Sequence, residues 1–283
     1  MIAGAREELE RVLCARVSRA EPVSGGDINE AFAVELSDGR RIFIKAHRTA
    51  PPGMFEAEAR GLAWLAEASA LRVPRVIAVG VAFLALEWLE PGRPLSGFDE
   101  SLGRGLAALH RASPAGFGLD HDNFIGSLPQ SNRAHTSWVD FFREERLGAQ
   151  LELARKKHRA SAAMERGFSH LFERLPELLG PSEPPARLHG DLWGGNLHVG
   201  PDGEPCLIDP AVYGGHREID LAMMKLFGGF SPRVFSAYAE AFPLAPGHAE
   251  RVQLYQLYPL MVHVNLFGGS YVGSVERALL ALA

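Results

Sequence analysis

The chain has 283 residues, of which 47% are hydrophobic, enough to bury a sizeable core in one large domain or two smaller ones. Its 29 basic and 34 acidic residues give a net charge of -5 without any long run of Lys or Arg, which argues against a nucleic-acid partner. Only Cys14 and Cys206 are present, too few for a disulfide framework or a cysteine metal cluster, so a reducing compartment fits best.

The start of the chain carries charge at Arg6, Glu7 and Glu8, where a signal peptide would need an apolar core. The longest apolar stretches, such as residues 76–86, are well short of the roughly 20 residues needed to span a bilayer. We therefore expect a cytoplasmic protein that makes no membrane contact.

The first third of the chain has the pattern of a small β-rich lobe. Two runs of alternating apolar and polar residues are joined into a hairpin by a Ser37-Asp38-Gly39 turn, and Lys45 ends the second run. Lys45 shares one face of its strand with Arg41 and Phe43. In chain order, we predict a helix over residues 5–19, a glycine-containing turn over 24–27, strands over 31–36 and 41–45, a helix over 55–68 and a buried strand over 82–86.

Helical periodicity replaces the β pattern after the segment Pro91-Gly92-Arg93-Pro94. We therefore place a hinge near residues 87–94, between an N-terminal nucleotide-binding lobe (1–88) and a C-terminal helical catalytic and acceptor-binding lobe (89–283). The predicted fold class is α+β, a bilobal protein-kinase-like fold with a small β-rich N-lobe and a larger helical C-lobe.

The most polar constellation of the chain lies between two short β-like segments, 187–188 and 205–208. It contains Asp191 and, five residues later, Asn196, and Asp209 follows the second β-like segment. Phosphoryl transfer needs a carboxylate beside the acceptor hydroxyl and oxygen ligands that hold Mg²⁺ on the nucleotide phosphates. The Asp-x-x-x-x-Asn spacing is that of the protein-kinase catalytic loop. Stability alone could explain one capping Asp or one Asn beside glycines, but it does not readily explain the combined pattern.

The N-terminal lobe supplies candidates for nucleotide binding. Lys45 stands where a kinase places the lysine that pairs with the α- and β-phosphates, and Glu58 in the following helix is its expected partner, with Glu56 as the alternative. Gly25 and Gly26 could bring backbone N–H groups close to phosphate oxygens, although an ordinary hairpin turn explains them equally well.

These motifs resemble the aminoglycoside phosphotransferase and choline kinase superfamily, and more closely the fructosamine kinase (ketosamine-3-kinase) family. The closer resemblance rests on the His189-Gly190-Asp191-Leu192-Trp193 loop, the Asp209-Pro210-Ala211 extension and the helix that begins near Trp138. It continues over most of the chain, from Gly25 to about Gly269.

The resemblance implies ATP- and Mg²⁺-dependent phosphorylation of the C3 hydroxyl of a ketosamine, a glycated amine whose phosphorylated form releases the free amine. It also implies that Asp191 is the base, that Asn196 and Asp209 bind Mg²⁺, and that the adenine edge meets backbone groups of Glu87 and Leu89 in the hinge.

Other residues near the motif have two open interpretations. Trp193 could stack on the sugar or its amine-bearing arm, or it could be a core aromatic residue. His216 could line the acceptor side, or it could lie in a solvated loop. His189 is better explained as a structural donor that braces the loop than as a proton shuttle. Several family members carry Cys where this chain has Asp27, so a thiol-based dimer switch at that position is absent here.

Two rival functions remain open at this stage. A related kinase could act on an aminoglycoside, choline or homoserine, but an antibiotic kinase is expected to have a strongly acidic acceptor pocket. The segment from Glu240 to Ala283 offers only Glu240, Glu250 and Glu276. A nucleotide-binding pseudokinase without turnover is the second rival, and the filled catalytic positions count against it. The oligomeric state cannot be read from the sequence.

Overall fold

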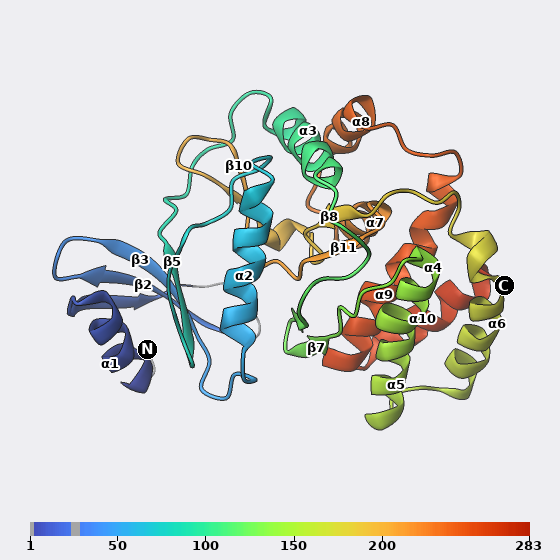
Figure 1. The fold of residues 1–283 in the computed structure, drawn as a ribbon, viewed down its shortest axis with the longest axis horizontal. Coiled ribbons are helices and arrows are strands. Elements are labelled where there is room, and N and C mark those ends of the chain that lie inside the picture. Colours follow the sequence, from blue (N-terminus) through green and yellow to red (C-terminus); the bar gives the residue numbers. More distant parts are fainter. Residues whose placement is uncertain (1–2, 24–28) are drawn as a thin grey trace.

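The computed structural model describes residues 3–23 and 29–283, so Gly25, Gly26 and Asp27 lie outside the described residues. A small lobe built on an antiparallel sheet lies beside a larger lobe of helices (Figure 1). None of the described helices is long and apolar enough to cross a membrane.

The N-terminal sheet has five strands in the order β1-β2-β3-β5-β4, and each neighbouring pair is antiparallel. One face, with Ile42 and Ile44, packs on helix α1, and the other, with Leu84 and Leu86, packs on helix α2. The alternation predicted for the second hairpin strand is therefore correct, and it leaves Lys45 on the α2 side. The elements are α1 (Ala3–Leu13), β1 (Val17–Pro22), β2 (Glu30–Leu36), β3 (Arg41–Ala46), α2 (Met54–Glu67), β4 (Val76–Gly80) and β5 (Phe83–Glu87).

The helix predicted over residues 5–19 ends earlier than expected. Cys14 adopts a left-handed backbone conformation (φ 50°), directly after α1 ends at Leu13. The carboxylate of Glu10 then accepts a hydrogen bond from the Val17 N–H at 2.8 Å, which helps turn the chain into β1. The prediction was wrong at this point because strand β1 gains backbone hydrogen bonds to β2 that helical periodicity cannot reveal.

The larger lobe contains the remaining helices. Leu102, Leu106 and Leu109 form one buried stripe, and Trp138, Phe141 and Phe142 form a second buried group. The helices are α3 (Phe98–Arg111), α4 (Trp138–Phe141), the π-helix η1 (Phe142–Gly148), α5 (Ala149–Lys156), α6 (Ala162–Leu178), α7 (Glu218–Phe227), α8 (Pro232–Ala241), α9 (His248–Phe267) and α10 (Ser270–Ala281).

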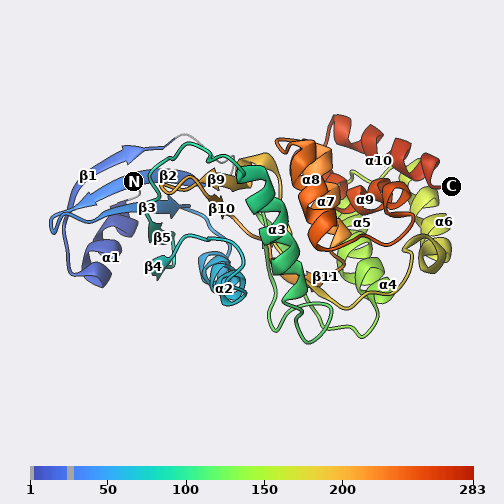
Figure 2. The same ribbon diagram turned by 90° about the horizontal axis from the view of Figure 1, so that it is seen from above.

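Three two-stranded sheets connect these helices to the smaller lobe. The hairpin of β9 and β10 lies beside the N-terminal sheet when the molecule is seen from above (Figure 2), and the Leu207 N–H donates to the Arg72 carbonyl at 2.9 Å. The division at residues 88 and 89 stays a prediction. The sheets pair β6 (Asn123–Ile125) with β7 (Leu128–Gln130), β8 (Ala186–Leu188) with β11 (Tyr213–Gly215), and β9 (Leu197–Val199) with β10 (Pro205–Leu207).

Candidate active site

The loop that carries Asp191 follows β8 and is folded tightly against the segment that precedes β11. Gly190 has φ 81°, and a Cβ at this position would lie 2.0 Å from the carbonyl oxygen of Ala211. Only glycine fits there, because it tolerates this backbone conformation and leaves room for the carbonyl. The His189 imidazole donates from Nε2 to the Ile208 carbonyl at 3.0 Å. This arrangement agrees with the predicted bracing role of His189.

Asp220 on α7 holds the same loop from behind, and the sequence reasoning did not identify it. Its two carboxylate oxygens accept hydrogen bonds from the backbone N–H groups of His189 (2.8 Å) and Gly190 (2.9 Å). The His110 ring, at the end of α3, lies 3.2 Å from the same carboxylate. Burial alone would raise the pKa of Asp220, but the hydrogen bond from His110 and the neighbouring charges lower it overall. The loop is therefore anchored to a buried, charged carboxylate.

The side chain of Asn196 helps to orient Asp191. Its side-chain amide donates to the Asp191 backbone carbonyl at 2.8 Å and lies 3.3 Å from the Asp191 carboxylate. Burial, and then the nearby carboxylate of Asp209, raise the pKa of Asp191 to about 7. A carboxyl group with this pKa can take up a proton near neutral pH, as a general base must.

Lys45 pairs with one carboxylate in its own lobe and with another in the larger lobe. Its ammonium group lies 2.6 Å from Glu58 and also forms an ion pair with Asp209 of the larger lobe. Burial alone would lower the pKa of Lys45, but the two carboxylates outweigh burial and raise it. The partner of the lysine is therefore Glu58, the first choice of the sequence analysis. The alternative, Glu56, is exposed. Asp209 has a positive φ of 57°, a strained conformation for a residue with a Cβ.

A cleft of about 730 Å³ opens between the lobes and contains most of the predicted site residues. Lys45, Glu58, Glu87 and Leu89, the residues proposed to bind the nucleotide, line it from the smaller lobe and the hinge. Asp191, Asn196 and Asp209 line it from the larger lobe, and so does Trp193, whose residue surface is 41% exposed. The interpretation of Trp193 as a core residue is therefore wrong. The functional roles of these residues stay predictions.

The oxygen atoms at this point of the cleft suit a hard divalent cation. Asn196 uses its amide nitrogen for Asp191, which leaves the amide oxygen available. One carboxylate oxygen of Asp209 pairs with Lys45, and the side chain is 37% exposed toward the cleft. An amide oxygen and a carboxylate oxygen are ligands that Mg²⁺ prefers, so the donor set fits the predicted metal.

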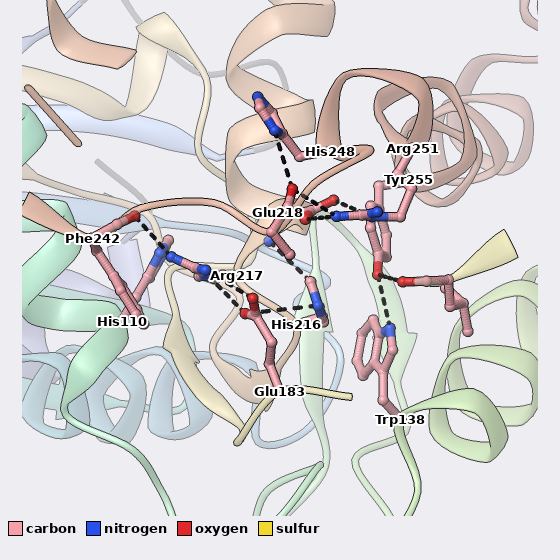
Figure 3. A network of polar contacts seen from close by, with 12 residues as sticks. His110, Trp138, Glu183, His216, Arg217, Glu218, Phe242, His248, Arg251 and Tyr255 are labelled. Carbon is pink, nitrogen blue, oxygen red and sulfur yellow. Dashed lines mark hydrogen bonds and ion pairs between the residues drawn. The ribbon is translucent and has the colours of Figure 1, made fainter. Parts of the chain in front are cut away.

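His216 is not part of this cleft, contrary to the prediction. It is buried in the larger lobe, where its ring stacks on Tyr255 with 5.3 Å between ring centroids (Figure 3). Its Nε2 lies 3.8 Å from Glu183, and Glu183 also binds Arg217 through two hydrogen bonds. Glu218, two residues after His216, is paired with Arg251 at 2.6 Å. The conspicuous polar motif around His216 therefore stabilises the packing of α7 and α9.

The burial of His216 leads to a testable prediction about the stability of the protein at acid pH. Burial is the main cause that lowers its pKa to about 4, from an ordinary value of 6.5. As the pH falls from 6.5 toward 4, His216 becomes protonated in the unfolded chain but stays neutral in the folded protein. The free energy of unfolding should therefore fall over this range, by roughly 3 kcal/mol from this group.

Urea unfolding at pH 7 and pH 4.5 measures this loss. The His216→Gln variant should lose much less stability between the two pH values than the wild type does. His170→Gln, at an exposed histidine of α6, is the matched control and should behave like the wild type. An equal acid-induced loss in the wild type and His216→Gln would assign the effect to other groups.

An aromatic group on α7, α9 and α10 lines the other end of the cleft and was missed by the sequence analysis. His263 lies at its centre, with ring-centroid distances of 4.6 Å to Phe227, 4.9 Å to Tyr271 and 5.5 Å to Phe267. All four side chains line the cleft, and Phe267 is 52% exposed. His263, Phe267 and Tyr271 are spaced four residues apart, but Phe227 comes from α7, so the sequence spacing alone does not bring the group together.

A close backbone contact places this aromatic group beside the catalytic loop. A Cβ on Gly194 would lie 3.0 Å from the Cα of Gly229, and one on Gly229 would lie 2.8 Å from the Cα of Gly194. Gly194 follows Trp193 directly, and Gly229 lies two residues after Phe227. The pair of glycines therefore lets the end of α7 touch the loop that carries Asp191.

Comparisons with known proteins agree with this site. The family model described as fructosamine kinase matches residues 3–282. The chain is 42% identical over 271 residues to a probable ketoamine kinase of Synechocystis, covering 93% of this chain and 90% of that protein. It is 36% identical over 266 residues to a chloroplastic protein-ribulosamine 3-kinase of Arabidopsis thaliana, covering 92% and 81%.

Solved structures show the same relationship and confirm the predicted fold. A candidate fructosamine-3-kinase from Thermobifida fusca superposes with a TM-score of 0.90 and 37% identity over 99% of both chains. A choline kinase from Streptococcus pneumoniae shares only the fold, with a TM-score of 0.67 and 14% identity over 98% of this chain and 97% of that one. The chain is therefore a phosphotransferase with a bilobal protein-kinase-like fold, and it belongs to the fructosamine kinase family.

Proposed function

We propose that this protein transfers the γ-phosphate of ATP, with Mg²⁺, to the C3 hydroxyl of a ketosamine such as fructosyl- or ribulosyl-lysine. The observation that carries the proposal is the convergence of Asp191, Asn196, Asp209 and Lys45 on one cleft between the lobes. Family relatives named as ketoamine and ribulosamine kinases support this class of acceptor.

Each group has a role that its surroundings support. Asp191 would accept the proton of the sugar hydroxyl, and its raised pKa favours that uptake. Lys45, fixed by Glu58, would neutralise charge on the α- and β-phosphates. Asn196 and Asp209 would hold Mg²⁺, which neutralises charge on the phosphates when it is bound. Catalysis would come mostly from positioning and electrostatics, because phosphoryl transfer needs little covalent help from a protein.

The acceptor end of the cleft favours a ketosamine over an aminoglycoside. Among the residues that line the cleft, the acidic ones are Glu58, Glu87, Asp191 and Asp209. Glu58 and Asp209 pair with Lys45 and Glu87 lies at the hinge, which leaves Asp191 as the only carboxylate available to the acceptor among these. A polycationic antibiotic would gain little from such a surface, whereas aromatic faces suit one amine-bearing arm.

His263 offers the acceptor substrate a hydrogen-bonding group in the cleft. Its Nδ1 lies 2.8 Å from the Pro259 carbonyl, which can only accept, so Nδ1 carries the proton. Burial lowers the pKa of His263, so the ring is neutral and Nε2 is an acceptor. A sugar hydroxyl or a secondary ammonium group of a ketosamine can donate to this nitrogen.

Coupled ATP turnover tests the proposal directly. We expect Mg²⁺-dependent phosphorylation of fructosyl-lysine or ribulosyl-lysine, no turnover with choline or kanamycin, and loss of activity when EDTA removes the metal. Phosphorus–proton NMR couplings of the product should place the phosphate at C3. Turnover with choline or kanamycin alone would discard the acceptor assignment. ATP binding without turnover on any sugar amine would favour the pseudokinase alternative.

A further inference from the structure

Arg187 carries a largely buried positive charge that the proposed mechanism does not use. It lies on β8, two residues before His189 in the loop of Asp191, and its side chain is 12% exposed. Among the described residues, the carboxylate that pairs with it is Glu67, at 3.2 Å, and that side chain is 65% exposed. A cation held this far from solvent needs further partners, because losing its hydration costs free energy.

The further partners of Arg187 are the C-terminal ends of two helices. Its Nη1 donates to the carbonyl of Trp64 in the last turn of α2, and its Nε donates to the carbonyl of Ala112, directly after α3, at 3.3 Å. The Ala68 N–H, which would bond to the Trp64 carbonyl in a continuing helix, lies 3.2 Å from the Leu65 carbonyl instead. The C-terminal carbonyls of a helix carry partial negative charge, so one guanidinium neutralises two helix ends.

This contact joins the helix of Glu58 to the larger lobe. The guanidinium of Arg187 also covers the indole ring of Trp64, 4.4 Å from its centroid. Three residues earlier on α2, a Cβ on Gly61 would lie 3.2 Å from the side chain of Val212 in the larger lobe. Figure 1 shows α2 between the N-terminal sheet and the larger lobe. Although α2 follows β3 in the chain, its C-terminal half is therefore packed on the larger lobe.

We propose that Arg187 is a positioning residue for the nucleotide site. By holding the C-terminal end of α2 against the larger lobe, it keeps Glu58, six residues before Trp64, in contact with Lys45. At a rise of about 1.5 Å per residue, Glu58 lies about 9 Å along the helix from this anchor. Without the guanidinium, two helix ends of like partial charge would face each other, and α2 would tilt away from β8. The inference rests on the proposed role of Lys45 and Glu58 in nucleotide binding, but it assigns a role to a side chain that bonds to the backbone of α2.

Isothermal titration of the full-length protein with ADP and Mg²⁺ tests the proposal without any turnover. Arg187→Met keeps the length of the side chain but removes its donors. This variant should raise the Kd of ADP about 10-fold, within the usual range for two coupled positions. Arg187→Lys retains the charge and one donor group, so it should recover part of the affinity.

A double-mutant cycle with Glu58→Gln separates positioning from general stabilisation. Glu58→Gln alone should also raise the Kd of ADP about 10-fold, because Lys45 loses one of its two carboxylate partners. If Arg187 acts through Glu58, then adding Arg187→Met to Glu58→Gln should change the Kd by less than about 2-fold. Independent effects, about 100-fold in the double variant, would show that Arg187 acts elsewhere and would overturn the proposal.

Arg60→Met is the matched control. Arg60 lies on the same helix and also pairs with the larger lobe, through Asp120 at 3.0 Å, but both side chains are exposed. Exposed pairs of this kind contribute little, so this variant should bind ADP like the wild type. The titrations are made at a temperature at which thermal unfolding shows every variant to be folded.

Unchanged ADP affinity in Arg187→Met would also overturn the proposal, while leaving the proposed kinase activity intact. A wild-type protein that binds no ADP would contradict the proposed function itself, and this inference with it.

Discussion

Replacing Asp191 with Asn is expected to lower kcat with a ketosamine acceptor by about 10³-fold while leaving the Kd of Mg²⁺ and ADP nearly unchanged. The amide has the shape of the carboxyl group but cannot take up the hydroxyl proton, and general-base catalysis commonly contributes about 10²- to 10⁴-fold. Asn196 can still donate to the backbone carbonyl of residue 191, so the loop should keep its conformation. Steady-state kinetics and ADP titration measure the two quantities separately.

Asp120→Asn is the matched control for this experiment. Asp120 carries the same functional group, its side chain is 75% exposed, and it pairs with Arg60 at 3.0 Å away from the cleft. The control should retain wild-type kinetics. If Asp191→Asn kept more than about a tenth of the wild-type kcat, then Asp191 would not be the general base.

The sequence predicted which of these residues meet in the cleft because they are close together in the chain or lie in a fixed order. Asp191 and Asn196 belong to one loop, and Asp209 follows the next short strand. Lys45 and Glu58 come from adjacent elements, a strand and the helix that follows it. Strand alternation could therefore place the lysine on the side of the helix before any tertiary contact was known.

The prediction failed where a residue's environment depends on distant segments. His216 follows the Asp209-Pro210-Ala211 motif in the sequence, but β11 leads it into the core between Glu183 and Tyr255. The aromatic group around His263 is the opposite case. Its members have the sequence pattern of core residues, and they line the cleft together only once three helices are packed. A motif reveals which residues share a loop, whereas burial and partners are properties of the folded chain.

Asp220 is another residue whose environment could not be predicted from the local sequence, and its position affects the loop that carries Asp191. An Asp between two apolar residues of a helix, as in Ile219-Asp220-Leu221, has no local signature of function. In the structure it is fully buried and accepts the backbone N–H groups of His189 and Gly190, which set the direction of the catalytic loop. The geometry of Asp191 is therefore fixed from α7, and His110 of α3 supports the same carboxylate.

Replacing Asp220 with Asn is accordingly expected to impair both stability and turnover. The amide has one acceptor oxygen, so one of the two backbone N–H groups would face an NH₂ donor and stay unpaired. A buried unpaired donor costs about 1–3 kcal/mol, which thermal or urea unfolding would detect. The loop should also shift, and a displacement of about 1 Å at a reacting group can cost 10²-fold in rate. We expect kcat to fall by about that factor at temperatures where the variant is still folded.

A control with similar destabilisation separates the two effects. Glu218→Gln weakens the buried pair with Arg251, two residues earlier on the same helix, but leaves the bonds to the loop of Asp191 in place. Both variants should unfold more easily than the wild type, and only Asp220→Asn should lose kcat per folded molecule. If the two variants lost kcat equally, Asp220 would merely stabilise the larger lobe. A loss confined to Asp220→Asn, with the KM for ATP little changed, would show that a buried carboxylate on α7 positions the base that the sequence motif supplies.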